Sequence, residues 1–263
     1  MNSITNLSLN ATIRFITGSL CAAAMIAAAD EDVKEKSVEL QFGYQVKASV
    51  SAGKESQPKA EDFRKDAEKG DAVAQHNLAV SYERGDGVKK DPREAFKWYM
   101  KAAEQGYAPS QNMVGAYCCL GLAGDKNPAE GVKWFRKAAE QNDAQAVENL
   151  AVCYEEGSGV NKDLNLAFKL HLKASELGNE RAQTNVGACF MEGNGTKKDP
   201  AEAVKWFRKA AEHGDVVGQF NLALCYADGI GVKADLDAAA KWAEKAAKNG
   251  HKDAQALLNR LKK

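Results

Sequence analysis

The chain has 263 residues, of which 44% are hydrophobic and 27% are charged, a balance that fits a folded protein with a continuous apolar core. Lysine and arginine together number 36, as do aspartate and glutamate, so the formal net charge is zero. This balance gives no basic footprint for nucleic acid and no polybasic segment for a membrane surface, and we expect neither as a partner.

Residues 1–29 differ in composition from the rest of the chain. They contain no acidic residue, Arg14 is their only basic side chain, and an apolar stretch runs from Phe15 to the sequence Ala27-x-Ala29. This order is typical of a secretory signal peptide, and the stretch is too short and too rich in alanine for a membrane span. We expect a cleaved signal and an exported protein, periplasmic or secreted. If the segment is retained, we expect a cytoplasmic protein.

Residues 30–57 are predicted to be a flexible linker, because they are rich in Lys, Glu, Ser and Gln without helical periodicity. The stretch Val38–Val46 alternates loosely and would form a strand only if another strand paired with it. Two S-x-x-K sequences begin at Ser51 and Ser56. A β-lactamase nucleophile would also need S-D-N and K-T-G elements, which the sequence lacks, so we expect no catalysis from these serines.

A 36-residue repeat occupies the rest of the chain. Its clearest mark is an Asx-Pro-x-Glu sequence followed four residues later by tryptophan, which begins at Asp91, Asn127 and Asp199. A fixed period of this size predicts a solenoid of stacked units. The predicted solenoid covers residues 58–263, with a leading half repeat at 58–69, five repeats at 70–105, 106–141, 142–177, 178–213 and 214–249, and a trailing helix at 250–263.

Each repeat is predicted to contain two antiparallel helices. The first begins after an Asp or Asn such as Asp71, which can cap free amides, and ends at a glycine such as Gly85, which suits a left-handed C-terminal residue. The second begins at Asx-Pro-x-Glu, where Asx caps the helix, proline takes the first position and glutamate can form a capping box. Helical periodicity places Ala74, Leu78 and Tyr82 in the core. We expect the space between helices to be filled by Trp98, Trp134, Trp206 and Trp242.

The repeat resembles the Sel-1-like repeat family, whose members are related to the tetratricopeptide repeats. The residues that carry the resemblance are Ala74-Gln75-x-Asn77-Leu78-Ala79-x-x-Tyr82-x-x-Gly85-x-Gly87-Val88-x-x-Asp91-x-x-x-Ala95-x-x-Trp98-Tyr99-x-x-Ala102-Ala103. The resemblance implies an all-α fold, a right-handed αα superhelix that acts as a scaffold or adaptor for other proteins.

The resemblance also supplies an alternative function. Some cysteine-rich bacterial members were assigned β-lactamase or penicillin-binding activity, so an exported cell-wall enzyme of the β-lactamase-like type is the second hypothesis. Those members resemble each other in having one disulfide per repeat, and this chain departs from that pattern. A purely structural role in homo-oligomers is a third possibility.

The cysteines and histidines of the repeats show no disulfide or metal-ligand pattern. Equivalent positions in stacked helices lie about 8–10 Å apart, beyond the limit of about 7 Å for a disulfide. We therefore expect no disulfides, and small buried apolar roles for Cys118, Cys119, Cys153, Cys189 and Cys225. The histidines fall in four different columns of the repeat, so we expect no metal and no cofactor at His76, His171, His213 or His251.

Specificity is expected where the columns of the first helix vary between repeats. If these helices line the concave side, the variable columns form a mixed polar and apolar groove. The recurring asparagines have two interpretations: hydrogen bonding between repeats, or an amide ladder that grips an extended peptide. Our leading hypothesis is a non-enzymatic scaffold that binds a peptide or partner protein in this groove. The candidate groove residues are His76, Asn77, Asn112, Glu148, Asn149, Arg181, Thr184, Asn185, Phe220 and Asn221.

Overall fold

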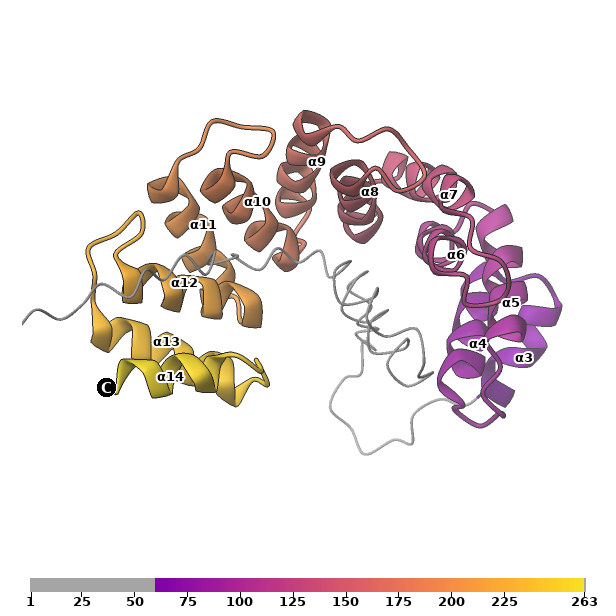
Figure 1. The fold of residues 1–263 in the computed structure, drawn as a ribbon. Coiled ribbons are helices and arrows are strands. Elements are labelled where there is room, and N and C mark those ends of the chain that lie inside the picture. Colours follow the sequence, from indigo (N-terminus) through magenta and orange to yellow (C-terminus); the bar gives the residue numbers. More distant parts are fainter. Residues whose placement is uncertain (1–59, 263) are drawn as a thin grey trace, which may run out of the picture.

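The computed structural model describes residues 60–262, which form twelve helices and no strand. Consecutive helices are antiparallel and stack into an arc (Figure 1). The helices are α3 (Ala60–Glu68), α4 (Ala72–Arg84), α5 (Pro92–Glu104), α6 (Ala108–Leu120), α7 (Pro128–Glu140), α8 (Ala144–Glu156), α9 (Leu164–Glu176), α10 (Glu180–Glu192), α11 (Pro200–Glu212), α12 (Val216–Asp228), α13 (Leu236–Lys248) and α14 (Ala254–Leu261). The predicted α-solenoid is therefore confirmed.

The signal peptide at 1–29 and the linker at 30–57, with its two serines, lie outside the described residues. Within residues 60–262, no helix combines the length and apolar character that crossing a membrane requires.

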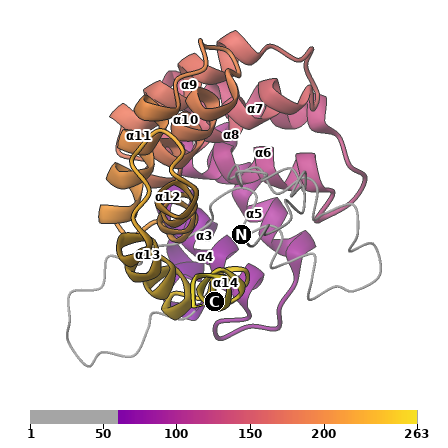
Figure 2. The same cartoon turned by 60° about the vertical axis from the view of Figure 1, so that its left-hand side comes forward.

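The first helices of the repeats lie on the inner side of the arc and the second helices on the outer side (Figure 1). The inner layer consists of α4, α6, α8, α10 and α12, and the outer layer of α5, α7, α9, α11 and α13. Figure 2 brings the C-terminal end of the arc, α12 to α14, to the front. Each helix from α4 to α13 has 13 residues, so successive repeats stack without a change of register.

The helix ends follow the local rules of the sequence. The Asp71 side chain accepts from the amide of Ala74 at the start of α4, and Gly85 ends that helix with φ of 84°. At Gly85 the left-handed backbone favours glycine because other residues would meet a steric penalty. The second glycine of the turn is required for a different reason, which the third repeat shows. There, a Cβ on Gly159 would lie 2.4 Å from the Pro128 carbonyl carbon. Glycine therefore lets this turn, and those at Gly195 and Gly231, approach the preceding second helix closely.

The predicted capping box does not form. The amide of the Asp91 cap already donates to the Tyr82 carbonyl at 2.9 Å, and the same backbone bond recurs at the other two Asx-Pro sequences. With that amide occupied, Glu94 accepts instead from Lys97 at 2.7 Å. Equivalent Glu–Lys pairs join Glu130 to Lys133 and Glu202 to Lys205.

The centre of the core is filled by the aromatic residue that follows Trp98, Trp134 and Trp206, and the tryptophans lie at its edge. Trp98 and Trp134 belong to the core as expected, whereas Trp206 and Trp242 contribute only in part. Tyr99, Phe135 and Phe207 are all 0% exposed, whereas Trp98 and Trp134 are 8% exposed and the later tryptophans are half-buried. One step along a helix turns the side chain by about 100°, which takes it from the edge of the core to its centre. The tryptophans instead carry lysine side chains over their rings, as at Lys101, whose Nζ lies 3.6 Å from the Trp98 ring centroid.

The repeats alternate between two kinds, a feature that the 36-residue period conceals. In α6 and α10 a glycine faces the phenylalanine of the next helix: a Cβ on Gly115 or Gly187 would lie 2.6 Å from the ring of Phe135 or Phe207. An arginine–tyrosine hydrogen bond recurs with the same spacing of 72 residues, at Arg64–Tyr82, Arg136–Tyr154 and Arg208–Tyr226. The intervening repeats place Met100–Cys118 and Leu172–Phe190 at the equivalent positions. Two successive repeats therefore form the larger unit of this solenoid.

Candidate functional site

The inner face of the arc is formed by the side of each first helix that points away from the core. With about 100° per residue, the columns that begin at Val73, Val80 and Arg84 lie opposite the core residue Leu78. The Val80 column holds small or aliphatic side chains and is buried. The Arg84 column is half-buried or exposed in every repeat and changes residue along the arc. Its members are Arg84, Leu120, Glu156, Glu192 and Asp228.

Most of the sequence-predicted groove residues lie between repeats. His76, Asn77 and Arg181 are half-buried. The other seven are at most 7% exposed: Asn112, Glu148, Asn149, Thr184, Asn185, Phe220 and Asn221. The columns of His76 and Asn77 flank the inner stripe, and stacking of the next repeat covers them.

The asparagine column connects consecutive first helices. Asn149 on α8 donates from Nδ2 to Asn112 Oδ1 on α6 at 2.8 Å. Asn185 on α10 donates to Glu148 on α8 at 2.5 Å. The geometry supports hydrogen bonding between repeats, the structural one of the two interpretations of this column. Binding of an extended peptide by these asparagine side chains stays a prediction.

Three further predicted residues contact the neighbouring repeat. His76 Nδ1 lies 2.8 Å from Ser110 Oγ, and burial lowers the pKa of His76 to about 4. Thr184 Oγ1 donates to Asp215 at 2.7 Å, which links α10 to the cap of α12. Phe220 stacks on His251 with ring centroids 4.1 Å apart. These contacts hold the repeats in register along the inner side of the arc.

A buried charged cluster in the third repeat was missed by sequence reasoning. His171 occupies the column of Tyr99, Phe135 and Phe207, and it is 0% exposed. Its Nδ1 lies 2.8 Å from Glu148 Oε2, and its Nε2 lies 3.7 Å from Glu155 Oε2. A histidine in a column whose other members from Phe63 to Phe207 are aromatic, within reach of a glutamate on the first helix, was the signal that could have revealed the cluster.

The electrostatics of this cluster favour an ion pair. Burial by itself would lower the pKa of His171, but the charge of Glu148, the hydrogen bond to it and the nearby Glu155 carboxylate outweigh burial and raise that pKa to about 9. Burial would raise the pKa of Glu148, yet His171, Arg181 and Asn185 hold it below its usual range. Both partners are inaccessible to a substrate, so the pair serves to join α8, α9 and α10.

The cysteines of the described residues lie on the first helices of the repeats. Cys119, Cys153, Cys189 and Cys225 are buried, as the sequence predicted, and Cys118 is half-buried. Burial raises the pKa of Cys118 to about 11 and that of Cys225 to about 12. Since the thiolate is the reactive form, the Cys118 and Cys225 thiols are weak nucleophiles at neutral pH. Within residues 60–262, no group of three His, Cys, Asp or Glu side chains could hold a metal ion.

Comparison with known proteins agrees with the repeat geometry. The family model described as Sel1 repeat matches five times, at residues 72–107, 108–143, 144–179, 180–215 and 216–251. A crystal structure of a Sel1 repeat protein from Oxalobacter formigenes is 37% identical, with a TM-score of 0.71, over 78% of this chain and 84% of that one.

A second solved structure is a protective antigen of uropathogenic Escherichia coli that displays an SLR (Sel-1-like repeat) fold. It is 35% identical, with a TM-score of 0.70, over 77% of this chain. The match spans 43% of the length of that antigen. No curated protein matches the chain.

Proposed function

The chain belongs to the Sel1 repeat family, and from this premise we propose that it is a non-enzymatic scaffold that binds a peptide or partner protein along the inner face of its arc. The observation that carries the proposal is the contrast between repeated and varied columns. The columns that cap helices and fill the core largely recur. The accessible Arg84 column changes residue type along the arc, as does the mostly buried His76 column that joins repeats. A surface that varies on a constant frame can provide specificity without loss of the fold.

The charge of the inner face supports a partner with basic side chains toward the C-terminal half. The Arg84 column begins with a cation, continues with Leu120, and then holds carboxylates at Glu156, Glu192 and Asp228 in three successive repeats. Adjacent stacked helices lie about 8–10 Å apart, so an extended chain can meet the three positions in turn. Charge complementarity of this kind steers association and fixes register.

Affinity capture with matched variants tests this proposal. Glu156→Lys with Glu192→Lys changes the last residue of two inner helices, α8 and α10. Glu140→Lys with Glu212→Lys changes the last residue of two outer helices, α7 and α11, by the same charge. We expect the proteins that bind the wild type, identified by mass spectrometry, to be lost from the inner variant and retained by the outer one. Equal recovery by both variants would contradict the assignment to the inner face.

The absence of enzymatic activity is part of the proposal and has its own test. Incubation of the purified protein with a chromogenic β-lactam is expected to give no hydrolysis above the buffer rate. Turnover by the wild type would establish the alternative function, and its survival in Ser51→Ala with Ser56→Ala would place the nucleophile elsewhere.

Export is also proposed, on the composition of residues 1–29. Mass spectrometry of the mature protein from its native cell is expected to find a chain that begins at Asp30. An intact N-terminus would instead place the scaffold in the cytoplasm.

A further inference from the structure

The two helical layers carry opposite charge, which the zero net charge of the whole chain conceals. When Lys, Arg, Asp and Glu are counted, each of the outer helices α5, α7, α9, α11 and α13 has a net charge of +1. The inner helices α4 and α6 are neutral, whereas α8, α10 and α12 have net charges of −3, −1 and −1. The outer side of the arc is therefore the basic side of the solenoid, opposite the carboxylates of the inner face.

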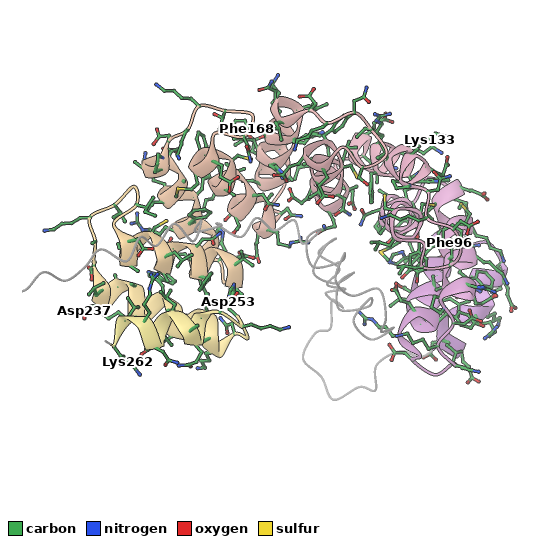
Figure 3. The ribbon with its side chains drawn as sticks, viewed as in Figure 1. Phe96, Lys133, Phe168, Asp237, Asp253 and Lys262 are labelled. Carbon is green, nitrogen blue, oxygen red and sulfur yellow. The ribbon has the colours of Figure 1, made fainter. Side chains whose placement is uncertain are left out.

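Two columns of lysine provide most of the positive charge on the outer side. The first column begins at Lys97, and Figure 3 shows its member Lys133 on the outer rim of the arc. An ion pair of 2.7 Å joins Lys97 to Glu94, and equivalent ion pairs recur at Lys133 and Lys205. In these three repeats, the first column is therefore neutralised by its own helix.

The second column, which we call the lysine row, is not neutralised in this way. It begins on α3, continues through all five outer helices, and all of its members are exposed. Within residues 60–262, no ion pair joins a lysine of the row to a carboxylate. The members of the row are Lys65, Lys101, Lys137, Lys173, Lys209 and Lys245.

Tryptophan rings hold most of the lysine row in place. The Nζ atom of Lys101 lies 3.6 Å from the Trp98 ring centroid, and equivalent contacts of 3.8, 5.0 and 4.0 Å recur at Lys137, Lys209 and Lys245. A cation over an aromatic face is attracted by the ring, so these side chains are ordered before a partner binds. Such ordering reduces the loss of side-chain entropy on binding.

The shape of the lysine row favours a single extended chain as the partner. Stacked helices lie about 10 Å apart and an extended polypeptide advances about 3.3 Å per residue, so the polypeptide would meet one lysine at about every third residue. The glutamates that end α5, α7, α9 and α11 lie three residues beyond the row, which keeps the positive strip narrow.

Two other anionic partners fit the lysine row less well. A flat anionic membrane would meet only part of a row that follows the convex side of the arc (Figure 1). Single-stranded nucleic acid stacks its bases on open aromatic faces, whereas lysine ammonium groups cover the Trp98 and Trp134 rings here. An acidic polypeptide needs neither a flat surface nor an open ring.

We propose that the lysine row binds an extended acidic polypeptide segment of a partner protein, with a carboxylate at about every third residue that faces successive repeats. Charge complementarity between the row and these carboxylates steers association and fixes the register of the segment. The row lies on the opposite side of the arc from the inner face, so the solenoid can hold a partner on each side. This proposal does not rest on the proposed function of the inner face.

Fluorescence anisotropy tests the proposal with the full chain and a labelled peptide of six Glu-Gly-Ser units. Lys101→Gln, Lys137→Gln and Lys209→Gln together form the row variant. The control variant has glutamine in place of the ion-paired lysine four residues earlier in each of the same helices, so the two variants have equal net charge. At low salt, we expect the row variant to bind the peptide about tenfold or more weakly than the wild type, and the control variant to stay within about threefold of it.

Three results would overturn the proposal. Equal weakening by the two variants would show that net charge, and not the lysine row, attracts the peptide. Equally tight binding of a peptide with Gln in place of Glu would show that carboxylates are not recognised. Tighter binding of anionic phospholipid vesicles or single-stranded DNA than of the peptide would assign the row to another polyanion. Circular dichroism should give the same helical spectrum for all three proteins, because the substituted lysines are exposed.

Discussion

The third and fourth repeats have the same helix lengths but opposite chemistry in their cores. In the fourth repeat, Phe207 fills the centre and packs against Gly187. In the third repeat, His171 takes that position and pairs with Glu148. The third repeat also has Leu164 and Leu170 where the fourth has Pro200 and Trp206.

This difference shows which parts of the repeat are required for the fold. The cap at Asp163 accepts from the Leu166 amide just as Asp199 accepts from Glu202, so α9 begins correctly without its proline. The core position tolerates either an apolar ring or an ion pair, provided that every buried charge has a partner. The two cores should nevertheless respond differently to substitution and to pH.

The largest expected effect comes from replacing one core residue of the third repeat with its equivalent from the fourth repeat. His171→Phe leaves Glu148 buried without the cation that is hydrogen-bonded to it, and we expect a loss of about 3–5 kcal/mol in the free energy of unfolding at pH 7. Exchange of the whole set, as Glu148→Thr, Ala151→Gly, Glu155→Met and His171→Phe, gives the third repeat the four core residues of the fourth. It should regain part of this loss, because Asn185 and Arg181 then lose their interactions with Glu148. Urea denaturation followed by circular dichroism measures both. A four-residue variant as unstable as the single one would contradict the view that the cores are interchangeable.

The second prediction concerns pH. The folded-state pKa of His171, about 9, lies above its usual value of about 6.5. The His171 contribution to stability is therefore complete below about pH 6.5 and is lost as the pH rises through about 9, a change of about 3 kcal/mol. The pKa of Glu148 is lowered in the folded protein, so this carboxylate contributes stability at pH values above the usual pKa of glutamate. This contribution is lost as the pH falls into the acid range. The free energy of unfolding of the wild type, minus that of the four-residue variant, should follow this profile.

A flat difference between pH 6 and pH 9.5 would show that His171 is neutral in the folded protein. Phe207→Ala provides the control in the fourth repeat, since its cost of about 3–5 kcal/mol comes from lost packing and should not vary with pH in this range.

A smaller effect is expected from the glycine that distinguishes the fourth repeat. A Cβ on Gly187 would lie 2.6 Å from the Phe207 ring, so Gly187→Ala should cost about 1–3 kcal/mol through overpacking. Gly124→Ala is the matched control, because a Cβ there meets nothing within 4 Å. Thermal unfolding of both variants compares a glycine with a clash, in a helix, with one without a clash, in a bend. Equal melting temperatures would show that the ring moves aside without cost.

The smallest effect concerns the exposed start of the second helix. The fourth repeat pairs Glu202 with Lys205 at 2.7 Å, whereas the third has Leu166 at the equivalent position, three residues before Lys169. Leu166→Glu should add this pair and stabilise the protein by up to about 0.5 kcal/mol. Melting temperatures at low and high salt measure the gain, which should shrink as salt screens the charges. A gain that is independent of salt would show that another interaction is responsible.

The sequence by itself determined the repeats, the helices and their ends. Asp71 as a cap and Gly85 as a left-handed stop could be predicted because these residues act on backbone groups within a few positions of themselves. The spacing of Leu78 and its equivalents likewise identified the core column, since helical periodicity is a local property.

Only the tertiary structure decided how the repeats meet. The amide that a capping box would need is bonded to the Tyr82 carbonyl of the preceding helix. Asn185 reaches Glu148 across 37 residues, and stacking covers a column that the helical wheel alone leaves beside the groove. A side chain on the flank of a helix can join two repeats or be free to bind a partner. Which of the two it does depends on the neighbouring helix. That neighbour comes from another repeat, so its position is set by packing and not by the local sequence.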